Sequence, residues 1–115
     1  MLSEDEYTNL AHRELLALIQ TLDELASDDV DCEMENDIVT LEFADDITYV
    51  INSHRAARQI WMAADRTAWH FDWVPESLSW VAKKNGDELW SAIRRVLSTK
   101  LPPEDVELRI QRPER

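Results

Sequence analysis

The sequence predicts an α+β fold: a two-layer sandwich in which an N-terminal and a C-terminal helix pack on one face of an antiparallel β-sheet. Apolar residues recur with helical spacing near both ends of the chain. Between these ends, apolar and polar residues alternate in several short runs, and turn-forming pairs separate the runs. Helices gathered on one face of such a sheet are typical of the α+β class. The 115 residues have the size of one domain, which we expect to span 1–115.

The first helix is expected over residues 4–25. Ser3 and Glu6 have the spacing of a capping box, in which each side chain accepts a hydrogen bond from the backbone amide of the other residue. An apolar stripe follows at helical spacing and comprises Tyr7, Ala11, Leu15, Leu18, Leu22 and Leu25. The residues left on or beside its polar side include Asn9, Glu14, Asp23 and Glu24. Acids near the C-terminal end of a helix oppose its dipole, so local helix stability does not account for the last two.

The strands are expected in the middle of the chain. Asp31, Glu33 and Glu35 alternate with Cys32 and Met34, which predicts an edge strand with one acidic face and one apolar face. Polar pairs mark the turns between the later strands. The expected strands cover residues 31–35, 38–43, 47–52, 59–63, 69–73 and 78–81, and residues 53–58 are expected to be irregular. Their inward side chains include Val39, Leu41, Phe43, Ile60 and Met62.

The second helix is expected over residues 88–99. Asn85-Gly86, which contains the only glycine, predicts a turn before it, and Asp87 has the character of its N-cap. Its inward residues are Leu89, Ile93, Val96 and Leu97. Pro102-Pro103 ends the helix. Residues 106–110 alternate, so we expect an extended tail there.

The net charge of −12 and the sequence pI near 4.5 exclude two classes of partner. Nucleic acids and anionic membrane surfaces bind proteins through Lys and Arg, so neither is expected here. The charge is also uneven, because residues 14–54 contain no Lys or Arg. We therefore expect an acidic half that meets a cation or a basic partner.

The expected location is the cytoplasm. No stretch reaches membrane-spanning length, and the acidic N-terminus lacks the basic flank and apolar core of a targeting peptide. Cys32 is the only cysteine, which excludes an internal disulfide and suits a reducing compartment. The mitochondrial matrix is the alternative if the chain is the processed form of a eukaryotic protein.

The densest acidic segment, residues 23–35, does not fit a calcium-binding EF-hand. An EF-hand loop that starts at Asp29 places Met34 where the loop needs Gly and Thr40 where it needs a bidentate Glu. What remains is an open array of carboxylates. Such oxygen ligands suit iron, manganese, calcium or magnesium with weak selectivity. A solvated acidic face with no ligand is the alternative, and both interpretations stay open at this level.

The histidines do not predict a catalytic site. His12, His54 and His70 have no metal-ligand spacing, and we interpret each as polar surface. His70 and Asp72 share one strand face and have the character of an acid–base pair, but no nucleophile or Gly-rich loop accompanies them. No catalytic residue is therefore predicted.

Trp61 is a candidate contact for a protein partner. The inward positions of Ile60 and Met62 place Trp61 on the outer face, with Gln59 beside it and Asn52 on a neighbouring strand. An outward Trp flanked by amides is typical of a binding hot spot. A Trp in a strand is normally a core residue, so the core remains the alternative.

Several blocks of the sequence resemble the frataxin family, in particular its bacterial CyaY type. They occur in family order and cover nearly the whole chain. The blocks are residues 29–33 (DVDCE), 49–52 (YVIN), 59–63 (QIWMA), 70–73 (HFDW), the Asn85-Gly86 turn, and Leu89-Trp90 in the following helix. The resemblance implies the frataxin fold and a role in iron-sulfur cluster assembly, as an iron donor or sensor or as a regulator.

The resemblance also implies which residues carry this role. Ferrous or ferric iron, or another divalent cation, would bind weakly to Asp23, Glu24, Asp28, Asp29, Asp31 and Glu33, with lesser contributions from Glu14, Glu42, Asp45 and Asp46. The partner contacts on the sheet would be Asn52, Gln59 and Trp61. The implied partners are a cysteine desulfurase and an iron-sulfur scaffold protein, and the chain is expected to be a monomer without iron.

Two features depart from the family pattern. Ile19-Gln20-Thr21 stands where bacterial relatives have further acids, which thins the array of carboxylates. Asp45-Asp46 stands where a hairpin commonly has Asn-Gly or Asp-Gly, so this turn needs a positive φ without glycine or a longer loop.

Two alternative functions stay open. One is an acidic interaction module that binds a basic partner, with incidental metal binding. The other is a ferroxidase, which is the one enzymatic interpretation of the acids.

Overall fold

The computed structural model describes residues 2–25 and 29–113. These residues form a seven-stranded antiparallel sheet with three α-helices and one short 3-10 helix, which confirms the α+β prediction. In chain order the elements are α1 (Glu4–Leu25), β1 (Val30–Glu35), β2 (Ile38–Phe43), β3 (Thr48–His54), η1 (Arg55–Ala57), β4 (Gln59–Ala64), β5 (Thr67–Val74), β6 (Ser79–Ala82), β7 (Asp87–Glu88), α2 (Leu89–Leu97) and α3 (Pro103–Arg109).

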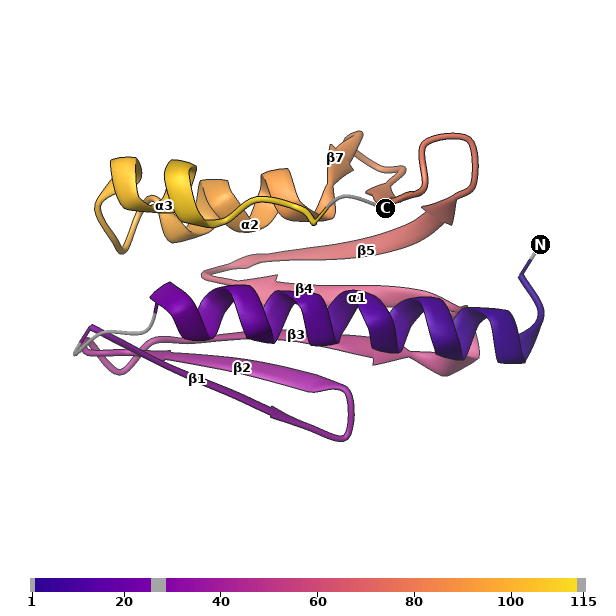
Figure 1. The fold of residues 1–115 in the computed structure, drawn as a ribbon, viewed down its shortest axis with the longest axis horizontal. Helices are drawn as coiled ribbons and strands as arrows, with labels where there is room; N and C mark the ends of the chain where they lie inside the picture. Colours follow the sequence, from indigo (N-terminus) through magenta and orange to yellow (C-terminus); the bar gives the residue numbers. More distant parts are fainter. Residues whose placement is uncertain (1, 26–28, 114–115) are drawn as a thin grey trace.

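The sheet is a meander in which every strand pairs with its neighbour in the chain, in the order β1 to β7. This order places β1 at one edge, as predicted. Figure 1 shows α1 running along the direction of the strands, with α2 and α3 next to each other on the side of the sheet that carries β5 and β7. The α1 helix contacts β1, β2, β3 and α3, whereas α2 contacts β6, β7 and α3. No helix in the described part of the chain is long and apolar enough to cross a membrane.

The core lies between the helices and one face of the sheet. The predicted stripe of α1 is buried at Tyr7, Ala11, Leu15, Leu18 and Leu22. Seven inward residues of the sheet are at most 2% exposed: Val39, Leu41, Tyr49, Ile51, Ile60, Met62 and Phe71. The other face of the sheet carries none of the described helices, so its side chains remain available to solvent or to a partner.

The predicted local signals form as expected at the start of the chain. The Ser3 amide donates to Glu6 Oε1 and the Glu6 amide donates to Ser3 Oγ, both at 3.1 Å, which is the capping box. Asn36 and Asp37 have φ of 52° and 59°, the left-handed geometry that a tight hairpin turn requires.

The Asp45-Asp46 turn combines the two expected alternatives, because it has a positive φ without glycine and its loop is longer than two residues: β2 ends at Phe43, and β3 begins at Thr48. Asp46 adopts a φ of 67° without glycine. The Ile47 amide donates to Asp45 Oδ1 at 3.1 Å, so the side chain of the first aspartate stabilises the turn.

The C-terminal third differs from the prediction in three places, the first of which is an unexpected short strand, β7, that pairs with β6. Glu88, not Asp87, caps α2, because its carboxylate accepts hydrogen bonds from the Trp90 and Ser91 amides. The expected extended tail is wrong, since residues 103–109 form α3.

The spacing of the apolar residues explains why residues 106–110 resemble an extended segment in the sequence. Val106, Leu108 and Ile110 fit an alternating strand, but residues four apart also share a helix face. In α3 and at its end, Val106 and Ile110 are fully buried while Leu108 is 80% exposed.

The loop before β4 is more regular than predicted. Ser53 and His54 extend β3, and residues 55–57 form η1. Arg58 then adopts a φ of 53°, which reverses the chain into β4. The prediction that residues 53–58 are irregular is therefore wrong for its first two residues, because they still pair with β4.

Candidate functional site

The acidic ridge, which we define as Asp23, Glu24, Asp29, Asp31 and Glu33, lies where the end of α1 meets the edge strand β1. All five residues are exposed. The alternation of β1 sends Asp31 and Glu33 to the outer side, while Cys32 and Met34 pack toward the core. Asp28, the sixth predicted member, lies outside the described residues.

Like charges face each other across the β1–β2 pair. Asp31 lies directly opposite Glu42 in the register, so the ridge gains a neighbour on the second strand. Facing like charges destabilise a sheet. Within the described ranges, no Lys or Arg forms an ion pair with Asp23, Asp31 or Glu33. These three carboxylates therefore carry negative charge that no ion pair within the described part of the fold neutralises.

The acids that were expected to make lesser contributions to cation binding differ in their surroundings. Glu42 and Asp46 are exposed. Asp45 binds Lys100 Nζ at 2.6 Å, and this hydrogen bond lowers the pKa of Asp45. Its charge is therefore already paired.

The prediction that Glu14 contributes to cation binding with the surface acids is wrong. Glu14 is 2% exposed, and its Oε2 accepts a hydrogen bond from Trp90 Nε1 at 2.8 Å. The side chain is buried between α1 and α2 because the indole N–H supplies a partner for its carboxylate. Glu14 is therefore not on the surface with the ridge.

The ridge is an open array and not a closed cage. Among the described residues, no three His, Cys, Asp or Glu side chains converge in a way that would hold a metal ion. Separated carboxylates at a surface suit hard cations that keep part of their hydration shell. Any ion bound here would exchange readily.

Cys32 does not add a thiolate to the ridge. Its Sγ is directed to the Leu22 carbonyl oxygen, 3.8 Å away. Burial, with the nearby charges of Asp23 and Asp31, raises the pKa of Cys32 to about 11. The thiol therefore stays protonated at neutral pH and is a poor metal ligand.

The neutral face, which we define as Asn52, Gln59 and Trp61, lies on the helix-free side of the sheet. Asn52 pairs directly with Trp61 across β3 and β4. Trp61 Nε1 donates to Gln59 Oε1 at 2.8 Å. All three residues are partly buried and point outward. Trp61 is therefore on the outer face of the sheet and is not a core residue.

Two histidines cover the ring of Trp61. The His54 ring stacks at 3.6 Å between centroids with an interplanar angle of 11°, and the His70 ring stacks at 4.3 Å and 19°. The prediction treated these histidines as separate polar residues. The strand register brings them together, since His70 lies opposite Trp61 and His54 lies opposite Gln59. The only sequence feature that points to this stack is the alternation of β3 and β5, which places the rings of His54 and His70 on the outer face.

Asp72, which shares a strand face with His70, contacts a third residue of that face. Asp72 Oδ1 accepts a hydrogen bond from Gln59 Nε2 at 3.1 Å. Gln59 therefore links Trp61 on one side to Asp72 on the other. These contacts hold the side chains of Gln59 and Trp61 in fixed orientations.

Comparisons with known proteins match this fold. The family profile described as "Frataxin-like domain" matches residues 1–103, which include the whole ridge and the whole neutral face. The "Iron-sulfur cluster assembly protein CyaY" of Ralstonia nicotianae is 35% identical over 101 residues, which cover 84% of this chain and 87% of that protein.

Two solved structures share the fold. Frataxin from Psychromonas ingrahamii superposes with a TM-score of 0.76 at 22% identity, over 85% of this chain and 90% of that one. Yeast frataxin superposes with a TM-score of 0.67 at 29% identity, over 87% of each chain. Both similarities agree with the α+β architecture described above.

Proposed function

Because this chain belongs to the frataxin family, we propose that it acts in iron-sulfur cluster assembly, where it binds iron weakly at the acidic ridge and docks on a cysteine desulfurase and its scaffold protein. The name of the Ralstonia relative supports the pathway. In this proposal the chain donates iron, senses it, or regulates the desulfurase. Iron is a cargo of the protein and not a resident cofactor.

The observation that carries the proposal is the charge of the ridge. Its carboxylates are exposed at a sheet edge, and described basic residues leave Asp23, Asp31 and Glu33 without ion pairs. Clustered carboxylates attract both hydrated cations and basic protein surfaces. Repulsion within the ridge falls when either one binds.

The neutral face supports a division of roles in docking. Charged surfaces steer a partner over a long range but position it poorly, whereas a desolvated aromatic contact fixes the register. Trp61 is held by Gln59 and by two stacked histidines, so it meets a partner in one orientation. We infer that the ridge attracts the partner and that the neutral face sets its position.

The test uses isosteric removal of charge. Asp29→Asn with Asp31→Asn removes two ridge charges, and Glu4→Gln with Glu76→Gln removes two exposed charges elsewhere. Anaerobic ferrous iron is titrated while backbone amides are followed by NMR. The affinity for the desulfurase–scaffold complex is measured in parallel by calorimetry.

The ridge variant is expected to lose both the amide broadening at α1 and β1 and most of the affinity for the complex. The control is expected to keep both. Broadening spread evenly over all surface acids, or equal losses in the two variants, would contradict a specific site.

An acidic interaction module with incidental metal binding is the second candidate. It is favoured by the finding that the described acids form no closed cage. Charge reversal with Asp29→Lys and Asp31→Lys separates the candidates. If binding to the complex is lost while iron binding is unchanged, the second candidate is correct. Catalytic turnover of ferrous iron in air would instead support the ferroxidase alternative.

A further inference from the structure

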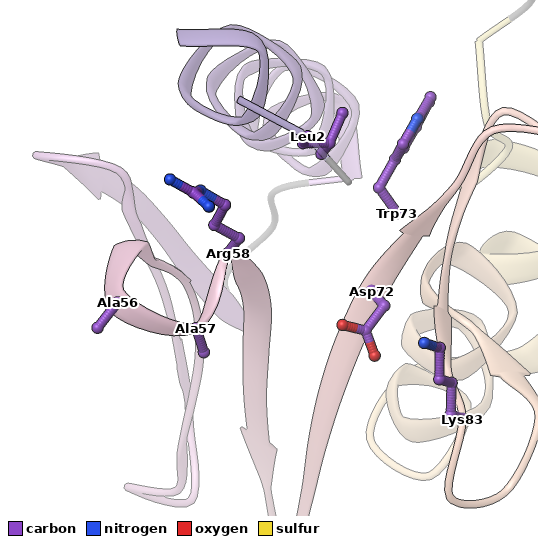
Figure 2. Close-up of a pocket in the computed structure, with 7 residues that line it drawn as sticks. All are labelled: Leu2, Ala56, Ala57, Arg58, Asp72, Trp73 and Lys83. Atoms are coloured by element: carbon purple, nitrogen blue, oxygen red, sulfur yellow. The ribbon is translucent and has the colours of Figure 1, made fainter. Parts of the chain in front are cut away.

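A pocket of about 360 Å³ lies at the side of the neutral face, close to the start of α1. Its lining residues come from several elements and are Leu2, Ala56, Ala57, Arg58, Asp72, Trp73 and Lys83. Figure 2 shows Asp72 between Arg58 on one side and Lys83 on the other, with Leu2 and Trp73 above them. The volume lies at the lower end of the range for ligand pockets, which is enough for one side chain of a partner.

The charge of this pocket is opposite in sign to the charge of the chain. Two cations and one carboxylate line it, whereas the whole chain has a net charge of −12. Lys83 forms no ion pair with a described residue. Asp72 already accepts a hydrogen bond from Gln59. Because the two cations outnumber the one carboxylate, an anionic group that enters meets a net attraction and a cationic group a net repulsion.

The pocket also has an apolar wall. Trp73 packs edge-on against Trp80 with ring centroids 5.5 Å apart, and Trp80 is only 1% exposed. This contact with the core fixes the indole of Trp73. Leu2 and Ala57 extend the apolar surface. A short apolar stem with an anionic head therefore fits the pocket, and Asp and Glu side chains have this form.

The pocket is continuous with the neutral face through Gln59. The Gln59 amide donates to Asp72 in the pocket wall, and its carbonyl oxygen accepts from Trp61. A partner that covers Trp61 and Gln59 therefore lies beside the pocket. A nucleic acid is not a suitable source of the anion, because its phosphates would meet the repulsion of the chain's net charge.

We propose that this pocket receives the carboxylate of an Asp or Glu side chain from the protein that docks on the neutral face. This inference rests on the proposed function and adds to it a second contact of opposite polarity. The ridge would bind a basic surface of the partner, and the pocket would bind an acidic residue. Two contacts of opposite sign admit one orientation of the partner and reject its reverse.

The test compares two neighbouring lysines. Lys83→Gln removes a cation from the pocket, and Lys84→Gln removes the same charge from the adjacent exposed residue, which does not line the pocket. Calorimetry with the purified desulfurase–scaffold complex is expected to show about tenfold weaker binding for Lys83→Gln, in the range for a charge-assisted contact. Lys84→Gln is expected to stay within about twofold of the unsubstituted chain, as exposed charges contribute little.

Carbodiimide cross-linking gives a direct second measurement. The reagent joins a lysine amine to a carboxylate that is already in contact with it. Mass spectrometry is expected to identify a Lys83 linkage to an Asp or Glu of the partner. Similar losses in the two lysine variants, or linkages from Lys84 alone, would overturn the proposal.

The remaining outcomes separate this inference from the proposed function. If the ridge variant weakens docking but Lys83→Gln does not, the inference fails and the proposed function stands. If the unsubstituted chain does not bind the complex, both fail. Micromolar binding of N-acetylglutamate at Lys83, together with an unchanged affinity of Lys83→Gln for the complex, would assign the pocket to free anions. Dimerisation that depends on Lys83 would assign the pocket to a second copy of the chain. Either result overturns the proposal.

Discussion

The imidazole of His54 lies 3.6 Å from the indole of Trp61, with the two ring planes 11° apart. His70 covers the opposite side, and Gln59 accepts the indole N–H. Both faces and the only polar atom of the indole are therefore occupied before any partner arrives. A partner meets the edge of a ring whose rotamer is already fixed.

Removal of either histidine should weaken docking without unfolding the chain. Ordering a mobile side chain at an interface costs about 0.5–1.5 kcal/mol, so His54→Ala and His70→Ala should each raise the Kd for the desulfurase–scaffold complex by about two- to twelvefold. Calorimetry measures the Kd. His12→Ala is the control, because His12 contacts Asp37 and lies away from Trp61. An equal loss for the control would refute a specific role for the stack.

Removal of the Glu14 side chain should destabilise the fold strongly. Glu14→Ala leaves the N–H of the fully buried Trp90 without its acceptor and opens a cavity between α1 and α2. We expect a loss of about 2–4 kcal/mol in the free energy of unfolding, measured by urea denaturation. Glu14→Gln keeps an acceptor and should cost less.

Gln20→Ala is the control for this prediction, because Gln20 is exposed on the same helix. It should stay within about 0.5 kcal/mol of the unsubstituted chain. If Glu14→Ala were equally mild, the contact with Trp90 would not contribute to stability.

Salt and divalent cations should raise the melting temperature. Asp31 faces Glu42 across the β1–β2 pair, and screening or binding reduces this repulsion. We expect a rise of about 2–6 °C in calcium chloride, since about 1 kcal/mol shifts Tm by several degrees in a domain of this size. Scanning calorimetry of the double variant Asp29→Asn with Asp31→Asn should show a higher Tm at low salt than the unsubstituted chain has. The further rise in Tm on addition of calcium chloride should be smaller. An unchanged Tm would contradict the repulsion.

The Cys32 thiol should react slowly until the solution is strongly alkaline. The pKa is raised from the ordinary 9.0 to about 11 by burial and by two nearby carboxylates, so little thiolate forms at neutral pH. Alkylation by iodoacetamide, followed by mass spectrometry, should accelerate as the pH approaches 11. Rapid alkylation at pH 7 in the native state would show that the thiol is more accessible than described.

The same shift makes stability depend on pH in a defined direction. The unfolded chain releases the Cys32 proton more readily than the folded chain, so folding is favoured fully below about pH 9. Stability should decline between the ordinary pKa of 9.0 and the folded value of about 11. Cys32→Ser should flatten this part of the stability profile in urea titrations at successive pH values.

Much of the fold could be predicted because its signals are local. The capping box of Ser3 and Glu6 forms as the sequence indicates, and the inward residues of β2 and β4 follow from alternation alone. The exposure of the acids follows from the same patterns, since Asp23 and Glu24 are adjacent at the end of α1 and Asp31 and Glu33 alternate with apolar residues in β1. These features require only the periodicity of helices and strands.

The features that were missed depend on residues far apart in the chain. Glu14 is buried only because Trp90, 76 residues later, donates to it. The stack on Trp61 requires the register of three strands. In α3, the spacing of Val106 and Ile110 satisfies a strand and a helix equally, and packing against the rest of the fold decides between them.

The consecutive order of the strands has a consequence for how the chain folds. Each of the six pairings joins segments that follow one another directly, so little loop entropy is lost when any of them closes. Topologies dominated by such short-range pairings fold faster than sheets with crossovers. We expect the sheet to assemble hairpin by hairpin, with few kinetic traps along the way.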